Sequence, residues 1–162
     1  PMNALGTAMT SFTAQNLGAR RCDRVREGYR GCLKMMALIA TAFAAVYVLL
    51  GDQVIRLFLN GENTQALSVG KQFLRVVAPF YYAVALKVAT DGVLRGAGRM
   101  GEFMTDTFID LALRVVLSFV LSAPLGLQGV WWSWPVSWVV ATVAAIVFYR
   151  QNRWAKLEPG DA

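Results

Sequence analysis

The sequence predicts an all-α fold, a polytopic bundle of membrane-spanning helices. Hydrophobic residues make up 56% of the 162-residue chain, whereas ordinary globular domains contain about 45–50%. Only 16% of the residues are charged, and the mean hydropathy is +0.45. The apolar residues form runs long enough to cross a bilayer, separated by polar joints. A soluble chain of this length could not bury so much apolar surface, so we expect the lipid bilayer to be its main partner.

Five stretches are predicted to form transmembrane helices, each of which needs about 20 mostly apolar residues. Residues 2–19 are rich in small side chains and lack charge, and we interpret them as an incomplete span that starts upstream. The other four spans are predicted at residues 33–59, 73–94, 103–121 and 127–149. Pro124 predicts a turn between the last two spans. Pro79 and Pro135 lie inside spans and are expected to bend them, because proline removes a backbone hydrogen-bond donor.

The distribution of Lys and Arg predicts how the chain crosses the membrane. These residues are concentrated in the joints at residues 19–31 and 95–102 and in the C-terminal tail, and are sparse in the intervening joints. The positive-inside rule then places the basic joints and the C-terminus in the cytoplasm, in a multi-pass protein of the cell membrane. We therefore do not interpret the net charge of +6 as nucleic-acid binding. Cys22 and Cys32 are interpreted as reduced thiols, and without His we expect no metal site.

Charged residues inside the predicted spans are the first candidates for function, because such residues are costly in a membrane. One span carries three of them on a single helix face, at intervals of four residues: Lys87, Asp91 and Arg95. The next span repeats the spacing with Asp106, Asp110 and Arg114. A rise of about 1.5 Å per residue places both triads in the cytoplasmic half of adjacent helices, where they could pair. They form either a network that only neutralises buried charge or a relay for protons or other cations.

The surroundings of the aspartates suggest different roles within these triads. Asp91 has a cation one turn before it and another one turn after it, and opposite charges hold a carboxylate ionised. We therefore expect Asp91 to be a structural counter-ion. Asp110 has one cation on its helix, Arg114, and a like charge at Asp106, which favours binding of a proton. Asp110 is accordingly the better relay candidate.

A few uncharged residues are also candidates for a cavity or a helix contact. Gln15 and Asn16 are polar residues at the end of the first span, and they either bond a neighbouring helix or line a cavity. Tyr81 could face lipid, the protein core or a substrate cavity. The bend expected at Pro135 could serve a transport path or only helix packing.

Three motifs resemble those of multidrug and toxic compound extrusion (MATE) transporters. Residues 4–7 (ALGT) and 14–19 (AQNLGA) resemble the eighth helix of that family. Residues 92–98 (GVLRGAG) resemble the cytoplasmic end of helix ten, and the matching positions include Arg95, Gly96 and Gly98. Residues 126–135 (GLQGVWWSWP) resemble the start of helix twelve. Together the three motifs extend over nearly the whole chain.

The resemblance implies a twelve-helix transporter of two six-helix lobes, of which this chain supplies helices eight to twelve of the C-terminal lobe. It implies export of small organic cations in exchange for H⁺ or Na⁺, with no cofactor, no enzymatic activity and an N-terminal lobe of the same polypeptide as partner. Some members carry an acidic residue in helix ten, but the matching residues 81–86 contain no acid. The resemblance therefore leaves the coupling ion undecided.

Two other functions share some of these sequence features. A lipid-linked sugar flippase of the same superfamily would need a cavity rich in cations, and the candidates Lys87 and Arg114 both have acids nearby. A membrane CDP-alcohol phosphotransferase would hold a divalent metal on aspartates such as Asp91, Asp106 and Asp110. That signature does not fit, because Arg95 comes one residue early and the aspartate pair three residues early, which rotates the side chains around the helix.

Overall fold

The computed structural model describes residues 1–56, 64–151 and 153–155, and these residues form helices connected by short joints. The α-helices are α1 (Met2–Gly18), α2 (Cys22–Arg56), α3 (Thr64–Val77), α4 (Tyr81–Gly96), α5 (Met100–Leu125) and α6 (Leu127–Arg150). Two 3₁₀ turns complete the description, η1 (Ala78–Phe80) and η2 (Arg153–Ala155).

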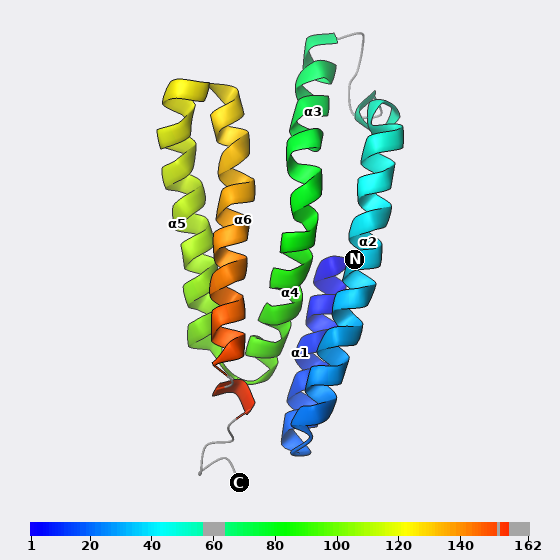
Figure 1. Ribbon diagram of the computed structural model, residues 1–162, viewed down its shortest axis with the longest axis vertical. Helices are drawn as coiled ribbons and strands as arrows, with labels where there is room; N and C mark the ends of the chain where they lie inside the picture. The colour runs from blue at the N-terminus through cyan, green and yellow to red at the C-terminus, as the bar shows by residue number, and fades with distance from the viewer. Residues whose placement is uncertain (57–63, 152, 156–162) are drawn as a thin grey trace.

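Helix α4 is at the centre of the bundle (Figure 1). It packs against α1 and α2 on one side and against α6 on the other, while α5 and α6 form a closely packed antiparallel hairpin. Helix α5 makes much less contact with α4 than with α6. The hairpin therefore meets the rest of the bundle mainly through α6.

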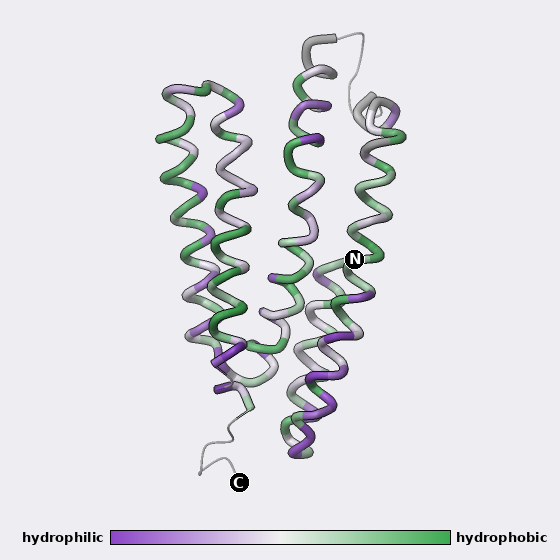
Figure 2. Tube along the Cα trace, viewed as in Figure 1, coloured by the Kyte–Doolittle hydropathy of each residue, from purple (hydrophilic) through white to green (hydrophobic). Residues whose placement is uncertain are grey.

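Within the described residues, four helical segments are long and apolar enough to cross a membrane: Cys22–Tyr47, Ser68–Gly96, Met100–Leu125 and Leu127–Arg150. Together with α1, they confirm the predicted all-α membrane bundle. The α1–α2 joint, the α4–α5 joint and the end of α6 all lie at one end of the bundle (Figure 1). Hydrophilic residues colour much of that end, around the start of α2 and the end of α6 (Figure 2).

Some helix boundaries differ from the prediction. Helix α2 already begins at Cys22, because the basic joint consists mostly of residues compatible with a helix and has Asp23 in its first turn. The predicted end of this span, residues 57–59, lies outside the described residues. Helix α5 continues through Pro124 to Leu125, so the turn predicted at residues 122–126 is confined to the last of them and does not occur at the proline. The chain reverses at Gly126, whose φ of +56° is readily available to glycine.

Pro79 interrupts the predicted span at residues 73–94. The α-helix stops at Val77, and residues 78–80 form the 3₁₀ turn η1 before α4 begins. Proline lacks the N–H that would continue the ladder, which explains the local change to 3₁₀ geometry. Pro135 has no such effect, because α6 remains one α-helix around it.

Glycines allow α1 and α4 to pack closely. A Cβ atom on Gly92 would lie 2.8 Å from the main-chain oxygen of Gly6, and one on Gly96 would collide with the main-chain oxygen of Thr10. Small residues four positions apart commonly permit such contact between membrane helices. The glycines of the 92–98 motif therefore bring α1 against the helix that carries the charged residues.

Candidate functional site

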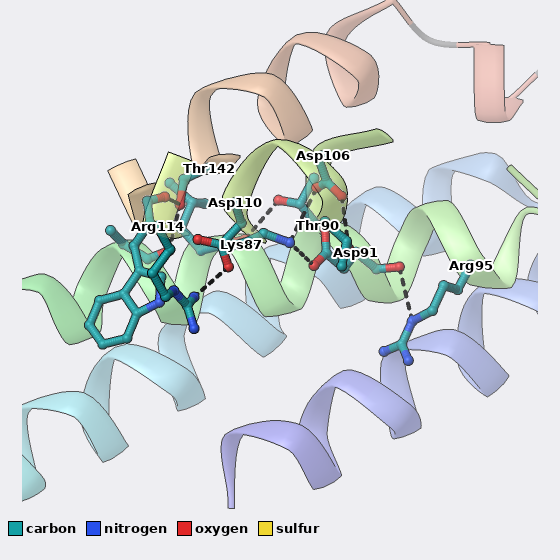
Figure 3. Close-up of polar contacts among 12 residues, drawn as sticks. Lys87, Thr90, Asp91, Arg95, Asp106, Asp110, Arg114 and Thr142 are labelled. Carbon is teal, nitrogen blue, oxygen red and sulfur yellow. Dashed lines mark hydrogen bonds and ion pairs between the residues drawn. The ribbon is translucent and has the colours of Figure 1, made fainter. Parts of the chain in front are cut away.

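A buried ion-pair cluster joins α4 to α5. Lys87 Nζ lies 2.6 Å from Asp91 Oδ2, one turn later on α4, and 3.4 Å from Asp106 Oδ2 on α5. The side chains of Lys87, Asp91 and Asp106 are 11%, 9% and 0% exposed. Figure 3 shows the lysine between the two carboxylates. We call these three residues the α4–α5 cluster.

The α4–α5 cluster has more carboxylate than ammonium. One lysine faces two aspartates, so its formal charge is −1 when all three groups are ionised. Asp91 Oδ1 and Asp106 Oδ2 are buried and accept no hydrogen bond among the described residues, and Asp106 Oδ2 has only the 3.4 Å ion-pair contact with Lys87 there. Asp106 Oδ1 accepts a 3.3 Å bond from the Thr107 hydroxyl. Uncompensated buried carboxylate is costly, so the cluster is suited to take up one more proton or small cation.

Arg95 does not join the cluster as its spacing suggested. Its Nε donates to the main-chain oxygen of Asp91 at 3.4 Å, and its guanidinium lies 5.2 Å from the ring centre of Phe103 on α5. Within the described part of the chain, Lys87 is the cation that contacts the Asp91 carboxylate. The expectation that two cations flank this carboxylate is therefore wrong, because the arginine side chain packs on an aromatic ring of the next helix.

The α5 triad is divided between two environments. Asp106 faces α4, whereas Asp110 Oδ2 accepts a 2.7 Å bond from Arg114 within α5. The Arg114 guanidinium lies 4.5 Å from the ring centre of Trp134 on α6. We call Asp110 and Arg114 the α5 pair. The predicted pairing between the two triads therefore occurs, but on α5 only Asp106 takes part in it among the described residues.

A small cavity adjoins the α4–α5 cluster. It has a volume of about 210 Å³ and is lined by Asn3, Thr7, Val88, Asp91, Arg95 and Phe103. Its walls come from α1, α4 and α5, and Asp91 both lines the cavity and contacts Lys87. Sequence analysis missed Asn3 and Thr7, although Thr7 belongs to the first motif. Asp91 is thus the residue of the cluster that borders this cavity.

The remaining predicted residues lie away from the cluster. Gln15 is exposed at the end of α1, and Asn16 bonds the main chain of Phe12 at 2.8 Å within the same helix. Tyr81 packs between the rings of Tyr47 and Trp138.

The other motif positions have structural surroundings. Gly96 lies against α1, and Gly98 turns the chain with φ of +71°. Pro135 is buried in α6.

Sequence analysis also missed a hydrogen bond next to Asp91. The hydroxyls of Thr90 and Tyr29 are 2.9 Å apart and buried, so α2 is tied to α4 beside the cluster. Tyr29 stacks on Tyr149, which stacks on Trp154, with ring centres 4.7 and 5.2 Å apart. No spacing along one helix could indicate a contact between residues 61 positions apart.

The described residues contain no group of three or more His, Cys, Asp or Glu side chains that could hold a metal ion. Asp106 faces Lys87 while Asp110 is bonded to Arg114. The aspartates therefore do not converge in the way a divalent-metal phosphotransferase would require.

Comparisons with known proteins identify a family and several relatives of this chain. The model of the MatE family matches residues 1–147. The chain is 30% identical over 159 residues to the probable multidrug resistance protein YpnP of Bacillus subtilis. The matched region covers 98% of this chain and 35% of that protein. It is 22% identical to the probable multidrug resistance protein NorM of Thermotoga maritima, covering 96% of this chain and 34% of that protein.

A mammalian protein is similar as well. Multidrug and toxin extrusion protein 2 of Mus musculus is 24% identical over 155 residues, which are 94% of this chain and 27% of that protein. The chain thus spans between 27% and 35% of the length of these three relatives. No solved structure matches the chain significantly.

Proposed function

Since this chain belongs to the MatE family, whose model matches residues 1–147, we propose that it is part of a secondary active antiporter. The antiporter exports organic cations and related drugs in exchange for H⁺ or Na⁺. The relatives with multidrug names support the substrate class. The observation that carries the coupling proposal is the buried α4–α5 cluster with its excess carboxylate.

The α4–α5 cluster binds the coupling ion. A proton or Na⁺ at the carboxylates of Asp91 and Asp106 neutralises the charge that Lys87 alone leaves uncompensated. Asp106 takes the place of Asp110 as the preferred relay residue, because Asp110 already forms a one-to-one pair with Arg114. The adjoining cavity connects Asp91 to the outside of the cluster.

Ion binding changes how firmly α5 is held to α4. These two helices make little other contact, whereas α5 and α6 pack closely. Occupied carboxylates hold α5 against α4, and the uncompensated charge left after ion release favours separation of these two helices, while α6 keeps its own packing on α4. A ligand that binds two arrangements unequally shifts the balance between them. Alternating access in such transporters is a rocking of one bundle against another, so we expect no transport by this chain alone.

The cytoplasmic side of the membrane is assigned to the basic end of the bundle by the positive-inside rule. This places the C-terminus, the α1–α2 joint and the α4–α5 joint in the cytoplasm. A lipid-linked sugar flippase is not favoured, because Lys87 and Arg114 are both paired with carboxylates and are not displayed for an anionic substrate.

The test is transport by the complete gene product in proteoliposomes, driven by a pH gradient or by a Na⁺ gradient. Asp106→Asn and Asp91→Asn each leave Lys87 with one carboxylate partner, so both variants should fold. We expect Asp106→Asn to abolish or strongly reduce gradient-driven export of a fluorescent cation while substrate binding persists. Glu102→Gln is the matched control on the same helix, because Glu102 is paired with Arg99 outside the cluster.

The proposal fails if Asp106→Asn and Asp91→Asn transport like the control under both gradients. The driving ion would then bind elsewhere in the polypeptide, and the cluster would be a structural link between α4 and α5. Export driven by the pH gradient alone would identify H⁺ as the coupling ion, and export driven by the Na⁺ gradient alone would identify Na⁺.

A further inference from the structure

Two aspartate–arginine pairs of this protein have the same four-residue spacing but different geometries. In the α5 pair, the Arg114 guanidinium donates to the Asp110 carboxylate at 2.7 Å. On α4 the corresponding arginine, Arg95, donates instead to the main-chain oxygen of Asp91 at 3.4 Å (Figure 3). Side chains four residues apart on a helix are within reach of each other, and the α5 pair shows this contact closed. On α4 the same contact is open.

The Asp91 carboxylate has an acceptor that no donor uses. Its Oδ2 contacts Lys87 at 2.6 Å, whereas its buried Oδ1 accepts no hydrogen bond among the described residues. A buried carboxylate oxygen without a partner is costly, so a positive group that reaches it is bound favourably. In the proposed transport cycle the coupling ion meets this need, and after its release the need returns.

Arg95 is held away from the carboxylate by weak contacts. Its guanidinium lies 5.2 Å from the ring centre of Phe103 on α5 and makes the long bond to the main chain of Asp91. The residue is half-buried. A contact between a cation and an aromatic ring is weaker at a partly exposed site, whereas a guanidinium bonded to a carboxylate forms one of the stronger hydrogen bonds in proteins. Phe103 therefore holds a cation close to Asp91 without fixing it there.

The cavity of about 210 Å³ gives this side chain space to turn. Asp91, Arg95 and Phe103 all line it. Its α1 wall is uncharged, because no residue of Met2–Gly18 carries a charge. The guanidinium can therefore turn from the ring to the carboxylate beside the cavity, without a shift of α4 and without leaving a carboxylate partner behind.

The other groups that face Asp91 are already engaged. Lys87 contacts both carboxylates of the α4–α5 cluster, including that of Asp106 on α5. On α2, the Tyr29 hydroxyl lies 2.9 Å from the hydroxyl of the threonine that precedes Asp91. Among the described residues, Arg95 is thus the cation that borders the same cavity as Asp91 without contacting a carboxylate.

We propose that Arg95 is a tethered cation that takes the place of the coupling ion at Asp91. While the ion occupies the carboxylates, the guanidinium stays on the Phe103 ring. When the ion leaves, the guanidinium turns to Asp91 Oδ1 and offsets the charge left there. This movement also ends the contact of Arg95 with α5, in agreement with the separation of α4 and α5 after ion release.

The inference rests on the proposed function, because it requires the coupling ion at Asp91. It adds that Arg95 competes with this ion and promotes its release, and that Phe103 sets how strongly the arginine competes. Arg95 and Phe103 are therefore positioning residues that act on the ion through Asp91.

The test is export by the complete gene product in proteoliposomes, measured as the H⁺ or Na⁺ concentration that gives half-maximal export. Arg95→Gln removes the competing cation, so half-maximal export should need about fivefold less coupling ion, the lower end of typical coupling between two sites. Arg95→Lys keeps a mobile charge and should lie closer to the unmodified protein. Arg99→Gln is the matched control, because Arg99 is paired with Glu102 outside the cluster, and it should leave the value unchanged.

Phe103→Leu tests the ring and should shift the same measurement in the opposite direction. Without the ring the guanidinium is free to contact Asp91, so half-maximal export should need more coupling ion. The double variant with Arg95→Gln should behave like Arg95→Gln alone, because the ring acts through the arginine. Phe108→Leu is the control for loss of an aromatic ring from α5, since Phe108 is 59% exposed.

Shifts in the same direction for Arg95→Gln and Phe103→Leu, or no shift in either, would overturn the inference. So would a double variant in which the two effects add. If Asp91→Asn and Asp106→Asn still lose gradient-driven export, the proposed function stands and only the role of Arg95 is wrong. If the two aspartate variants transport like Glu102→Gln, the coupling site and the tethered cation fail together.

Discussion

The α4–α5 cluster and the α5 pair both join aspartate to a basic side chain four residues away, but they differ in their surroundings and in their balance of charge. The cluster joins two helices, excludes solvent from Asp106 and contains two carboxylates for one lysine. The α5 pair is formed within one helix, has one carboxylate for one guanidinium and is 16–27% exposed at its side chains. Trp134 of α6 packs over its arginine. The residue types of a charged group therefore do not decide its role. Its role depends on which side chains of the neighbouring helix contact it.

The largest difference should appear when each cation is removed. Lys87→Met leaves two buried carboxylates without their shared partner, and breaking a buried pair costs about 3–5 kcal/mol. We expect a large fall in the unfolding temperature of the complete gene product in detergent. The double variant Lys87→Met with Asp91→Asn should recover part of the loss. A Lys87→Met protein as stable as the unmodified one would remove the distinction between the two regions.

Removing the cation of the α5 pair should cost less. Arg114→Met leaves Asp110 unpaired and removes the contact with Trp134, and one unsatisfied buried group costs about 1–3 kcal/mol. The methionine can keep part of the packing against the indole ring. Thermal unfolding under the same conditions as for Lys87→Met measures the difference. If Arg114→Met is the more damaging substitution, the α5 pair and not the cluster is the principal link within this part of the bundle.

The smallest effect is expected for ion coupling in Asp110→Asn. This substitution leaves the α4–α5 cluster with its excess carboxylate, so the pH dependence of export should stay as in the unmodified protein. Asp106→Asn should remove that dependence if the coupling ion is H⁺. Both variants are compared over the same pH range in proteoliposomes. A shifted pH profile in Asp110→Asn together with an unchanged one in Asp106→Asn would reverse the assignment.

Much of the candidate site could be predicted because it depends on intervals along one helix. Lys87 and Asp91 are four residues apart, and their 2.6 Å contact is what that interval allows. The same is true of Asp110 and Arg114. The interval failed for Arg95, whose side chain had an alternative contact with Phe103 on α5. The contact of Asp106 with Lys87 depends on which sides of α4 and α5 face each other. The spacing along each helix showed that the triads could pair, but it did not identify the two residues that meet.

By itself the sequence determined the membrane-helical class of the protein, the motifs that indicated its family and the position of charge along each helix. These properties follow from hydropathy, backbone chemistry and the helical repeat, all of which are local. Tertiary structure decided that Asp106 and not Asp110 meets Lys87, that Arg95 leaves the Asp91 carboxylate to the lysine, and that residues of three helices border one cavity beside it. Each of these depends on how one helix is rotated against its neighbour, and that rotation is set by packing contacts between residues far apart in the chain.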